Sequence, residues 1–269
     1  MRFELHCHST CSDGTERPEQ VAARAAERGV AVFALTDHDT CAGSAVLVPG
    51  ARVLRGVEMS CDHEGRTIHV LAFDRGGAGW PALEARLEGV RTARINRLRV
   101  MAAKLEHRGV RIDVEALLTA ATGRTVGRPD LARAMVASGA ATSMKDAFAR
   151  HLYDGGPVDV AHHALPITEA LALGVSANAA MALAHPATYD ELSVHIAKKY
   201  KGAGLSGIEA FAGGYDPRER TRWLELADKL GLVATGGSDW HGPEDANAQP
   251  GIDLPADRSE ALAAWLAIG

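Results

Sequence analysis

Histidine, aspartate and glutamate residues follow short apolar runs at several points of this chain. His6-Cys7-His8 comes after Phe3-Glu4-Leu5, and Asp37-His38 comes after Val32-Phe33-Ala34-Leu35. Similar runs lead to Glu58, His69, His185, Glu209, Asp239 and His241. Parallel α/β proteins place their chemistry at the carboxyl ends of strands. A single histidine of this kind is usually a satisfied core residue, but the recurrence predicts side chains that meet around a cluster of metal ions.

This mixture of imidazole and carboxylate donors suits Mn, Fe or Zn, and it does not select among them. Divalent ions about 3.5–4 Å apart can clamp a phosphoryl group and lower the pKa of a shared water towards ~7. The resulting metal-bridging hydroxide would attack phosphorus, so the chemistry requires no nucleophile from the protein.

The four cysteines are expected to be small buried thiols. Cys7, Cys11, Cys41 and Cys61 form no Cys-x-x-Cys pair, so a structural zinc knuckle is not indicated. Cys7 stands between two inward-pointing histidines and should therefore point to the opposite face of its strand. A sulfur ligand from Cys11 or Cys61 stays open as an alternative.

The elements that must position these residues follow an α/β pattern with one interruption. Strand and helix signals alternate from residue 1 to about 73, and residues 80–107 have the apolar spacing of one long amphipathic helix. From about 113 to 159 only short helical patterns occur. We therefore expect a barrel domain over residues 1–99 and 161–269. Residues 100–160 would be a helical insertion placed after the fourth strand, overhanging the C-terminal face.

Composition limits the partners. A formal net charge of −5 argues against a surface that binds a long nucleic acid. A small phosphorylated substrate remains compatible with this charge, because bound metal ions invert the local electrostatic field. The apolar stretches are too short to span a membrane, and no charged leader precedes Phe3, so a cytoplasmic enzyme is expected. The oligomeric state stays open.

The order of the motifs resembles that of the polymerase-and-histidinol-phosphatase (PHP) family of phosphoesterases. Its motifs run His-x-His, Asp-His, Glu, His, Ala-His-Pro and Ser-Asp-x-His. This chain has all of them in order, ending in Ala184-His185-Pro186 and Ser238-Asp239-Trp240-His241. The resemblance spans nearly the whole chain and implies a distorted, TIM-like (β/α)7 barrel that holds three divalent ions, with Mn favoured.

The resemblance also implies which residues hold each ion. One ion would take His6, His8, Glu58 and Asp239. Glu58 would bridge to a second ion on His69 and His185, and the third would take Asp13, His38 and His241. Glu58 and Asp239 would thus have catalytic roles. Asp37 either orients His38 or delivers a proton to the leaving group, and the orienting role is favoured.

Three further residues are candidates for substrate contact. Arg128 precedes a helix start, where a phosphate would meet both the guanidinium and the helix N-terminus. His162 follows a Gly-Gly-Pro turn, at a position where related nucleotide phosphatases have a histidine. Glu209 could accept a hydrogen bond from substrate or support a metal ligand, and the sequence does not decide between these.

The predicted function is hydrolysis of a phosphomonoester of a small molecule, with a nucleoside 3′,5′-bisphosphate as the favoured substrate. The single-domain family members with a helical insert remove a 3′ phosphate from such bisphosphates, or trim short RNA from its 5′ end. Alternatives are a histidinol-phosphate phosphatase, a nuclease acting on short oligonucleotides, and a non-catalytic scaffold. Asp130 and Asp159 depart from the family pattern. Either they point away from substrate, capping a helix or pairing with arginine, or the substrate is not a bisphosphate; capping is plausible for Asp130, which stands in a first helical turn. Asp130→His is predicted to leave folding intact and to lower KM for nucleoside 3′,5′-bisphosphates with little change in kcat.

Overall fold

A nearly closed sheet forms the centre of the molecule. The computed structural model describes residues 1–161, 164–244 and 249–267. The strands are β1 (Arg2–Glu4), β2 (Val32–Leu35), β3 (Arg52–His63), β4 (Arg66–Asp74), β5 (Leu165–Pro166), β6 (Ala179–Leu183), β7 (Gly207–Ala212), β8 (Val233–Gly237) and β9 (Ile252–Asp253). They follow the order β8-β7-β6-β4-β3-β2-β1-β9, with β5 paired to β3. Seven of them, β1–β4 and β6–β8, make the distorted α/β barrel that the sequence predicts.

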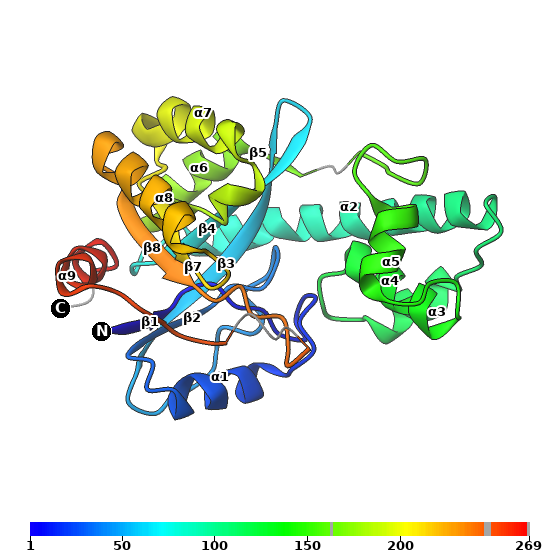
Figure 1. Cartoon of the computed structure of the whole chain (residues 1–269), viewed down its shortest axis with the longest axis horizontal. Coiled ribbons are helices and arrows are strands. Elements are labelled where there is room, and N and C mark those ends of the chain that lie inside the picture. Colours follow the sequence, from blue (N-terminus) through cyan, green and yellow to red (C-terminus); the bar gives the residue numbers. More distant parts are fainter. Residues whose placement is uncertain (162–163, 245–248, 268–269) are drawn as a thin grey trace.

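Helices cover the barrel and also build a separate lobe (Figure 1). The helices are α1 (Pro18–Glu27), α2 (Trp80–Glu106), α3 (Val114–Ala120), α4 (Arg128–Ala137), α5 (Met144–Ala147), α6 (Ile167–Ser176), α7 (Glu191–Tyr200), α8 (Pro217–Leu230) and α9 (Ala256–Trp265). Shorter turns are the π-helix η1 (Phe148–Leu152) and the 3₁₀-helices η2 (Pro186–Thr188) and η3 (Lys201–Ala203). Within the described residues, none of these helices is both long and apolar enough to cross a membrane.

The gap between β8 and β1 closes through backbone contact rather than a continuous ladder. The amide of Asp239 donates to the carbonyl of His6 at 2.7 Å, and the amide of His8 donates to the carbonyl of Trp240 at 2.8 Å. Gly237 permits this approach, because a Cβ atom there would lie 2.4 Å from the backbone nitrogen of His6. The segments after β1 and β8 are therefore held side by side.

The strand β4 is the main departure from the expected parallel arrangement. It pairs antiparallel with both β3 and β6, with Glu58 opposite Leu71 and Val70 opposite Leu183. His69 consequently lies near the beginning of its strand, and the expectation that it stands at a carboxyl end was wrong. An antiparallel strand presents its amino end where its neighbours present their carboxyl ends, so His69 still faces the same rim.

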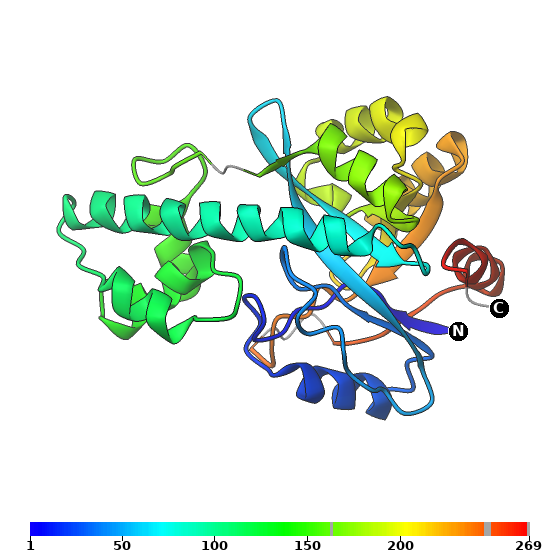
Figure 2. The same ribbon diagram turned by 180° about the vertical axis from the view of Figure 1, so that it is seen from behind.

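The helix α2 connects the barrel to the lobe of short helices (Figures 1 and 2). It has 27 residues and therefore a length of about 40 Å. Its first half buries Leu83 and Leu87 in the barrel core, while its second half buries Leu98 and Met101 in a separate apolar cluster with residues of α4. The lobe thus has a core of its own, consistent with the insertion that we propose over residues 100–160.

Candidate metal centre

Nine side chains with nitrogen or carboxylate donors meet at one end of the barrel. They follow β1, β2, β6 and β8 or lie within β3 and β4: His6, His8, Asp13, His38, Glu58, His69, His185, Asp239 and His241. His6, His8 and Glu58 are buried at the bottom, whereas the side chains of Asp239 and His241 are more than a third exposed. The structure therefore brings together all nine residues that the family motifs indicate, although their roles as ligands stay predictions.

The nine side chains form a ring of metal-binding donors, called the donor ring here, and Glu58 is at its centre. Its Oε1 lies 2.9 Å from Nε2 of His185 and 3.0 Å from Nδ1 of His69, and its Oε2 lies 3.0 Å from Nδ1 of His38. Nε2 of His8 is 3.2 Å from Oε2, and Nε2 of His6 is 3.4 Å from Oε1. One carboxylate close to five imidazoles has the position that a bridging ligand between two ions requires.

Two other carboxylates, those of Asp239 and Asp13, also lie close to imidazole nitrogens of the site. Oδ1 of Asp239 lies 3.3 Å from Nε2 of His6 and 3.2 Å from Nε2 of His8. Oδ1 of Asp13 lies 3.4 Å from Nε2 of His241. Gly14, just after Asp13, allows the loop to turn tightly, because a Cβ there would lie 2.7 Å from the carbonyl carbon of His8.

The donor set fits divalent metal ions. Nε2 of His6, Nε2 of His8, Nδ1 of His38 and Oε2 of Glu58 are buried and make no hydrogen bond. Buried polar atoms without a hydrogen-bond partner cost free energy unless another group, such as a metal ion, satisfies them. Among the described residues, no group of side chains close enough together to hold a metal ion contains a cysteine. Cys7 is buried, and its thiol is directed to the carbonyl of Ala34.

Without metal, burial and the neighbouring charges shift the pKa values of the ring residues in different directions. Burial alone would raise the pKa of Glu58, but the imidazoles of His38 and His69 hold it well below its usual range. Burial would lower the pKa of His8, yet the carboxylates of Asp239 and Glu58 raise it to about 10. For His69, burial dominates and lowers the pKa to about 4. Several imidazoles must therefore lose a proton before they bind a cation.

Glu209 supports the ring from below. Its side chain is fully buried; Oε1 lies 3.0 Å from Nδ1 of His6, and Oε2 accepts a 2.6 Å hydrogen bond from the backbone amide of His185. A hydrogen bond to Nδ1 leaves Nε2 of His6 directed into the ring. Because this carboxylate has no exposed surface, the geometry favours the supporting role and not the alternative of direct contact with substrate.

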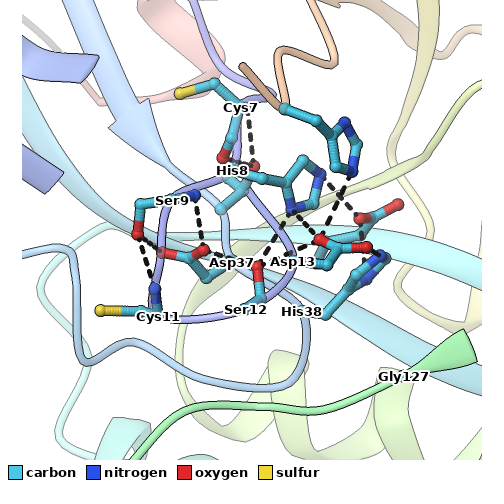
Figure 3. A network of polar contacts seen from close by, with 12 residues as sticks. Cys7, His8, Ser9, Cys11, Ser12, Asp13, Asp37, His38 and Gly127 are labelled. Atoms are coloured by element: carbon cyan, nitrogen blue, oxygen red, sulfur yellow. Dashed lines mark hydrogen bonds and ion pairs between the residues drawn. The ribbon is translucent and has the colours of Figure 1, made fainter. Parts of the chain in front are cut away.

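Asp37 organises the loop after β1 through hydrogen bonds to two serines. Its oxygens accept hydrogen bonds from the amide and hydroxyl of Ser9, both at 2.8 Å, and from the hydroxyl of Ser12 at 2.6 Å (Figure 3). The Ser12 hydroxyl also lies 3.4 Å from Nδ1 of His8. The two roles expected for Asp37, orienting His38 and donating a proton, are corrected to this one, because the carboxylate is buried and turned towards the loop.

Two of the proposed ligands have a strained backbone. His185 has φ 28° and Asp239 has φ 56°, a region that side-chain-bearing residues rarely adopt. Such conformations persist when the surrounding structure holds them, and they cluster at functional sites. The hydrogen bonds from the His185 amide to the Glu209 carboxylate and from the Asp239 amide to the carbonyl of His6 supply that support.

A cleft of about 530 Å³ lies between the ring and the helical lobe. Its ring side includes Asp13, His38, His69, His185 and Tyr189, and its other wall includes Arg97 and Arg128. Sequence reasoning identified Arg128 but missed Arg97 and Tyr189. The only sequence signal for Arg97 was a cation on the long helix, three residues after Arg94. His162 lies outside the described residues.

Two of the arginines that line the cleft, Arg97 and Arg128, are paired with carboxylates of the lobe. Arg128 contacts Asp154, and Nη2 of Arg97 lies 3.1 Å from Oδ1 of Asp159. Burial and the neighbouring Arg128 lower the pKa of Arg97, which indicates that the two cations stand close together. An anion between them would relieve this repulsion.

Asp130 does not face the cleft. Its Oδ2 accepts a 2.8 Å hydrogen bond from the amide of Gly127 at the start of α4, and its Oδ1 pairs with Arg124 at 2.6 Å. The expected alternative in which Asp130 points away and caps a helix is therefore the one that the geometry supports, and it gives no reason for Asp130→His to lower KM. Asp159 also has hydrogen-bond partners within the lobe. Its carboxylate accepts hydrogen bonds from the backbone amides of Gly155 and Val160 and from the side chain of Arg97.

A barrel whose rim gathers imidazole and carboxylate donors beside an arginine-lined cleft belongs to the class of metal-dependent hydrolases. Comparison with known proteins defines it further. The profile of the PHP domain matches residues 4–105. A 3′,5′-nucleoside bisphosphate phosphatase from Chromobacterium violaceum is 34% identical over 94% of this chain and 92% of its own length. A 5′-3′ exoribonuclease from Haemophilus influenzae is 32% identical over 90% of each chain.

The solved structures agree with this relation. A crystallised amidohydrolase from Chromobacterium violaceum, with bound sulfate, has a TM-score of 0.87 and 32% sequence identity, and the match covers 98% of this chain and 96% of that one. The chain belongs to the PHP family of metal-dependent phosphoesterases and is a hydrolase of phosphate esters. The predicted family, fold class and enzyme class are thereby confirmed.

Proposed function

We propose that this protein is a phosphomonoesterase of small molecules that acts on nucleoside 3′,5′-bisphosphates, with three divalent ions, manganese by preference, in the ring around Glu58. The observation that carries the proposal is the pairing of two anion-binding features across one cleft. The donor ring forms one wall, and Arg97 and Arg128 form the other. A substrate with two phosphates has a partner for each.

The chain's own residues divide the work. When bound, the ions would neutralise the reacting phosphoryl group and acidify a water molecule. His6, His8, Glu58 and Asp239 provide the buried part of the ring, and Asp13, His38, His69, His185 and His241 provide the part nearer the cleft. Glu209 orients His6 through Nδ1 of that imidazole, and Ser12 orients His8 in the same way.

The second phosphate would be held by the lobe. Arg97 and Arg128 can make charge-assisted hydrogen bonds to phosphate oxygens, exchanging Asp159 and Asp154 for the substrate. The volume of about 530 Å³ suits a nucleotide, since small-molecule sites measure roughly 300–1,000 Å³. A long nucleic acid would need a basic track beyond this cleft, which the net charge of −5 does not favour.

The alternative functions differ in what Arg97 and Arg128 would bind. Histidinol phosphate has a single phosphate, which the donor ring would hold, so Arg97 and Arg128 would stay paired with Asp159 and Asp154. A short oligonucleotide would place successive phosphates along the cleft, as the name of the Haemophilus influenzae relative suggests for that protein. A non-catalytic scaffold is disfavoured because all nine donor positions of the motifs are filled.

Release of inorganic phosphate, or of mononucleotides from the oligonucleotide, by manganese-reconstituted protein tests the proposal directly. The panel should contain a nucleoside 3′,5′-bisphosphate, the matching 3′- and 5′-monophosphates, histidinol phosphate and a 5′-phosphorylated tetranucleotide. We expect the bisphosphate to have the highest kcat/KM and to lose its 3′ phosphate. A higher kcat/KM for histidinol phosphate or for the oligonucleotide would replace the proposed substrate.

A further inference from the structure

A second cluster of possible metal ligands lies at the tip of the β3–β4 hairpin, away from the donor ring. It consists of His63 at the end of β3, Glu64 in the turn and His195 on α7. One donor atom from each residue lies within 4.8 Å of the other two. Figure 1 shows the hairpin tip rising on the side of the barrel where α7 lies. None of these residues is part of the PHP motifs.

The surroundings of His63 are a second, independent indication of a metal site. Its side chain is only 2% exposed, and its Nε2 is buried without a hydrogen-bond partner. The same Nε2 lies 3.9 Å from Oε1 of Glu64, and the ring of His63 is 5.7 Å from that of His195. A buried imidazole nitrogen facing an exposed carboxylate and an exposed imidazole has the surroundings of an incomplete metal site.

The other nitrogen of the His63 ring is already fixed. Nδ1 lies 3.1 Å from the hydroxyl oxygen of Tyr200, which can accept a hydrogen bond from the Nδ1–H group. Metal-binding histidines commonly donate their second ring N–H to such a group, which leaves the lone pair of the first nitrogen available. The turn also restrains Glu64, because Glu64 and Gly65 both have positive φ values, 53° and 82°.

We propose that His63, Glu64 and His195 bind one zinc ion, which joins the β3–β4 hairpin to α7. Two imidazoles and one carboxylate match the donors of zinc sites, and a water molecule would complete a tetrahedron. Gly65, Arg66 and Thr67, the next residues of the hairpin, line the substrate cleft. Zinc at the tip would therefore restrain one edge of that cleft.

Lys199 competes with the metal. Its Nζ lies 2.9 Å from Oε1 of Glu64, the same oxygen that faces His63. This is an exposed pair, and such pairs contribute little to stability, so a cation bound by two imidazoles can displace it. Removal of Lys199 should consequently tighten zinc binding.

Zinc titration of manganese-loaded full-length protein tests the site. We expect wild-type protein to bind one more zinc ion per chain than His195→Ala, as measured by calorimetry and by elemental analysis after desalting. Zinc should raise the melting temperature of wild-type protein more than that of His195→Ala or Glu64→Gln. His107→Ala, which removes another exposed histidine, just after the end of α2, is the matched control and should behave as wild type.

Two results would overturn the proposal: equal zinc stoichiometry in wild type and His195→Ala, or a Lys199→Ala variant that fails to bind the extra zinc more tightly. For Lys199→Ala we expect a dissociation constant lower by roughly two- to fivefold, the range of an exposed ion pair. Phosphate release by manganese-loaded His195→Ala should equal that of wild type without zinc. The outcome is thus independent of the substrate proposed above.

Discussion

Glu209 and His6 form a buried pair beneath the donor ring, with Oε1 of Glu209 3.0 Å from Nδ1 of His6. Neither side chain has exposed surface. The carboxylate therefore acts on the site through the orientation of the imidazole, and through the backbone of His185, to which it is also bonded.

Glu209→Gln should lower metal occupancy and kcat/KM by about 10- to 100-fold, the usual cost of losing such a supporting hydrogen bond. An amide at this position can accept only one of the two hydrogen bonds and lacks the charge. Metal content and phosphate release measure the effect, with the exposed Glu191→Gln as control. Equal metal content in Glu209→Gln and wild type would contradict the supporting role.

Glu58→Gln should abolish most activity while the protein remains folded. An amide cannot bridge two cations as a carboxylate does, and five imidazoles would lose their common partner. Phosphate release should fall by orders of magnitude, with a circular dichroism spectrum like that of wild type. Retention of most of the activity would remove Glu58 from the centre of the site.

Metal binding should strengthen as the pH rises. In the metal-free protein the pKa of His8 is raised to about 10 from an ordinary value of 6.5, so its imidazole is protonated at neutral pH and a metal must displace the proton. The stabilisation from this imidazolium is present below about pH 6.5 and is lost as the pH rises through about 10. We expect two to three manganese ions per chain by elemental analysis, with proton release on loading.

The melting-temperature difference between loaded and chelator-stripped protein should accordingly grow from about pH 6 to about pH 9. A stoichiometry of one ion or fewer would contradict the three-ion assignment. A difference that shrinks with pH would contradict the protonated state of the ring.

Arg128→Ala should raise KM for nucleoside 3′,5′-bisphosphates by about 10- to 100-fold, the value of a hydrogen bond between charged groups. It should have little effect on KM for a monophosphate, which uses only the metal ring. Arg99→Ala is a suitable control, because Arg99 lies on α2 and pairs with Glu115 instead of lining the cleft. Equal changes for both substrates would show that Arg128 does not hold a second phosphate.

Asp130→His should lower stability by about 1–2 kcal/mol and leave KM unchanged. The substitution removes the acceptor of the Gly127 amide at the start of α4 and the partner of Arg124. Chemical denaturation and steady-state kinetics measure the two effects. A lower KM with unchanged stability would restore the hypothesis of repulsion between Asp130 and substrate.

The sequence by itself determined much of the site and the broad fold. Donor residues after apolar runs placed His6, His8, His38, His185 and Asp239 on one rim, because strands of a barrel end at a common face. The spacing of Leu83, Leu87, Leu98 and Met101 predicted the long helix, which the structure has as Trp80–Glu106. These are local patterns, and local geometry is sufficient to interpret them.

Only the tertiary structure decided the direction of β4 and the partners of the buried carboxylates. A period of two along a strand is the same in either direction, so the sequence around His69 could not reveal that β4 is antiparallel. Glu209 and Asp37 each bond to residues far away in the chain, so their roles depend on which donors the folded chain brings beside them. Such pairings follow from the packing of whole elements, which no short segment of sequence encodes.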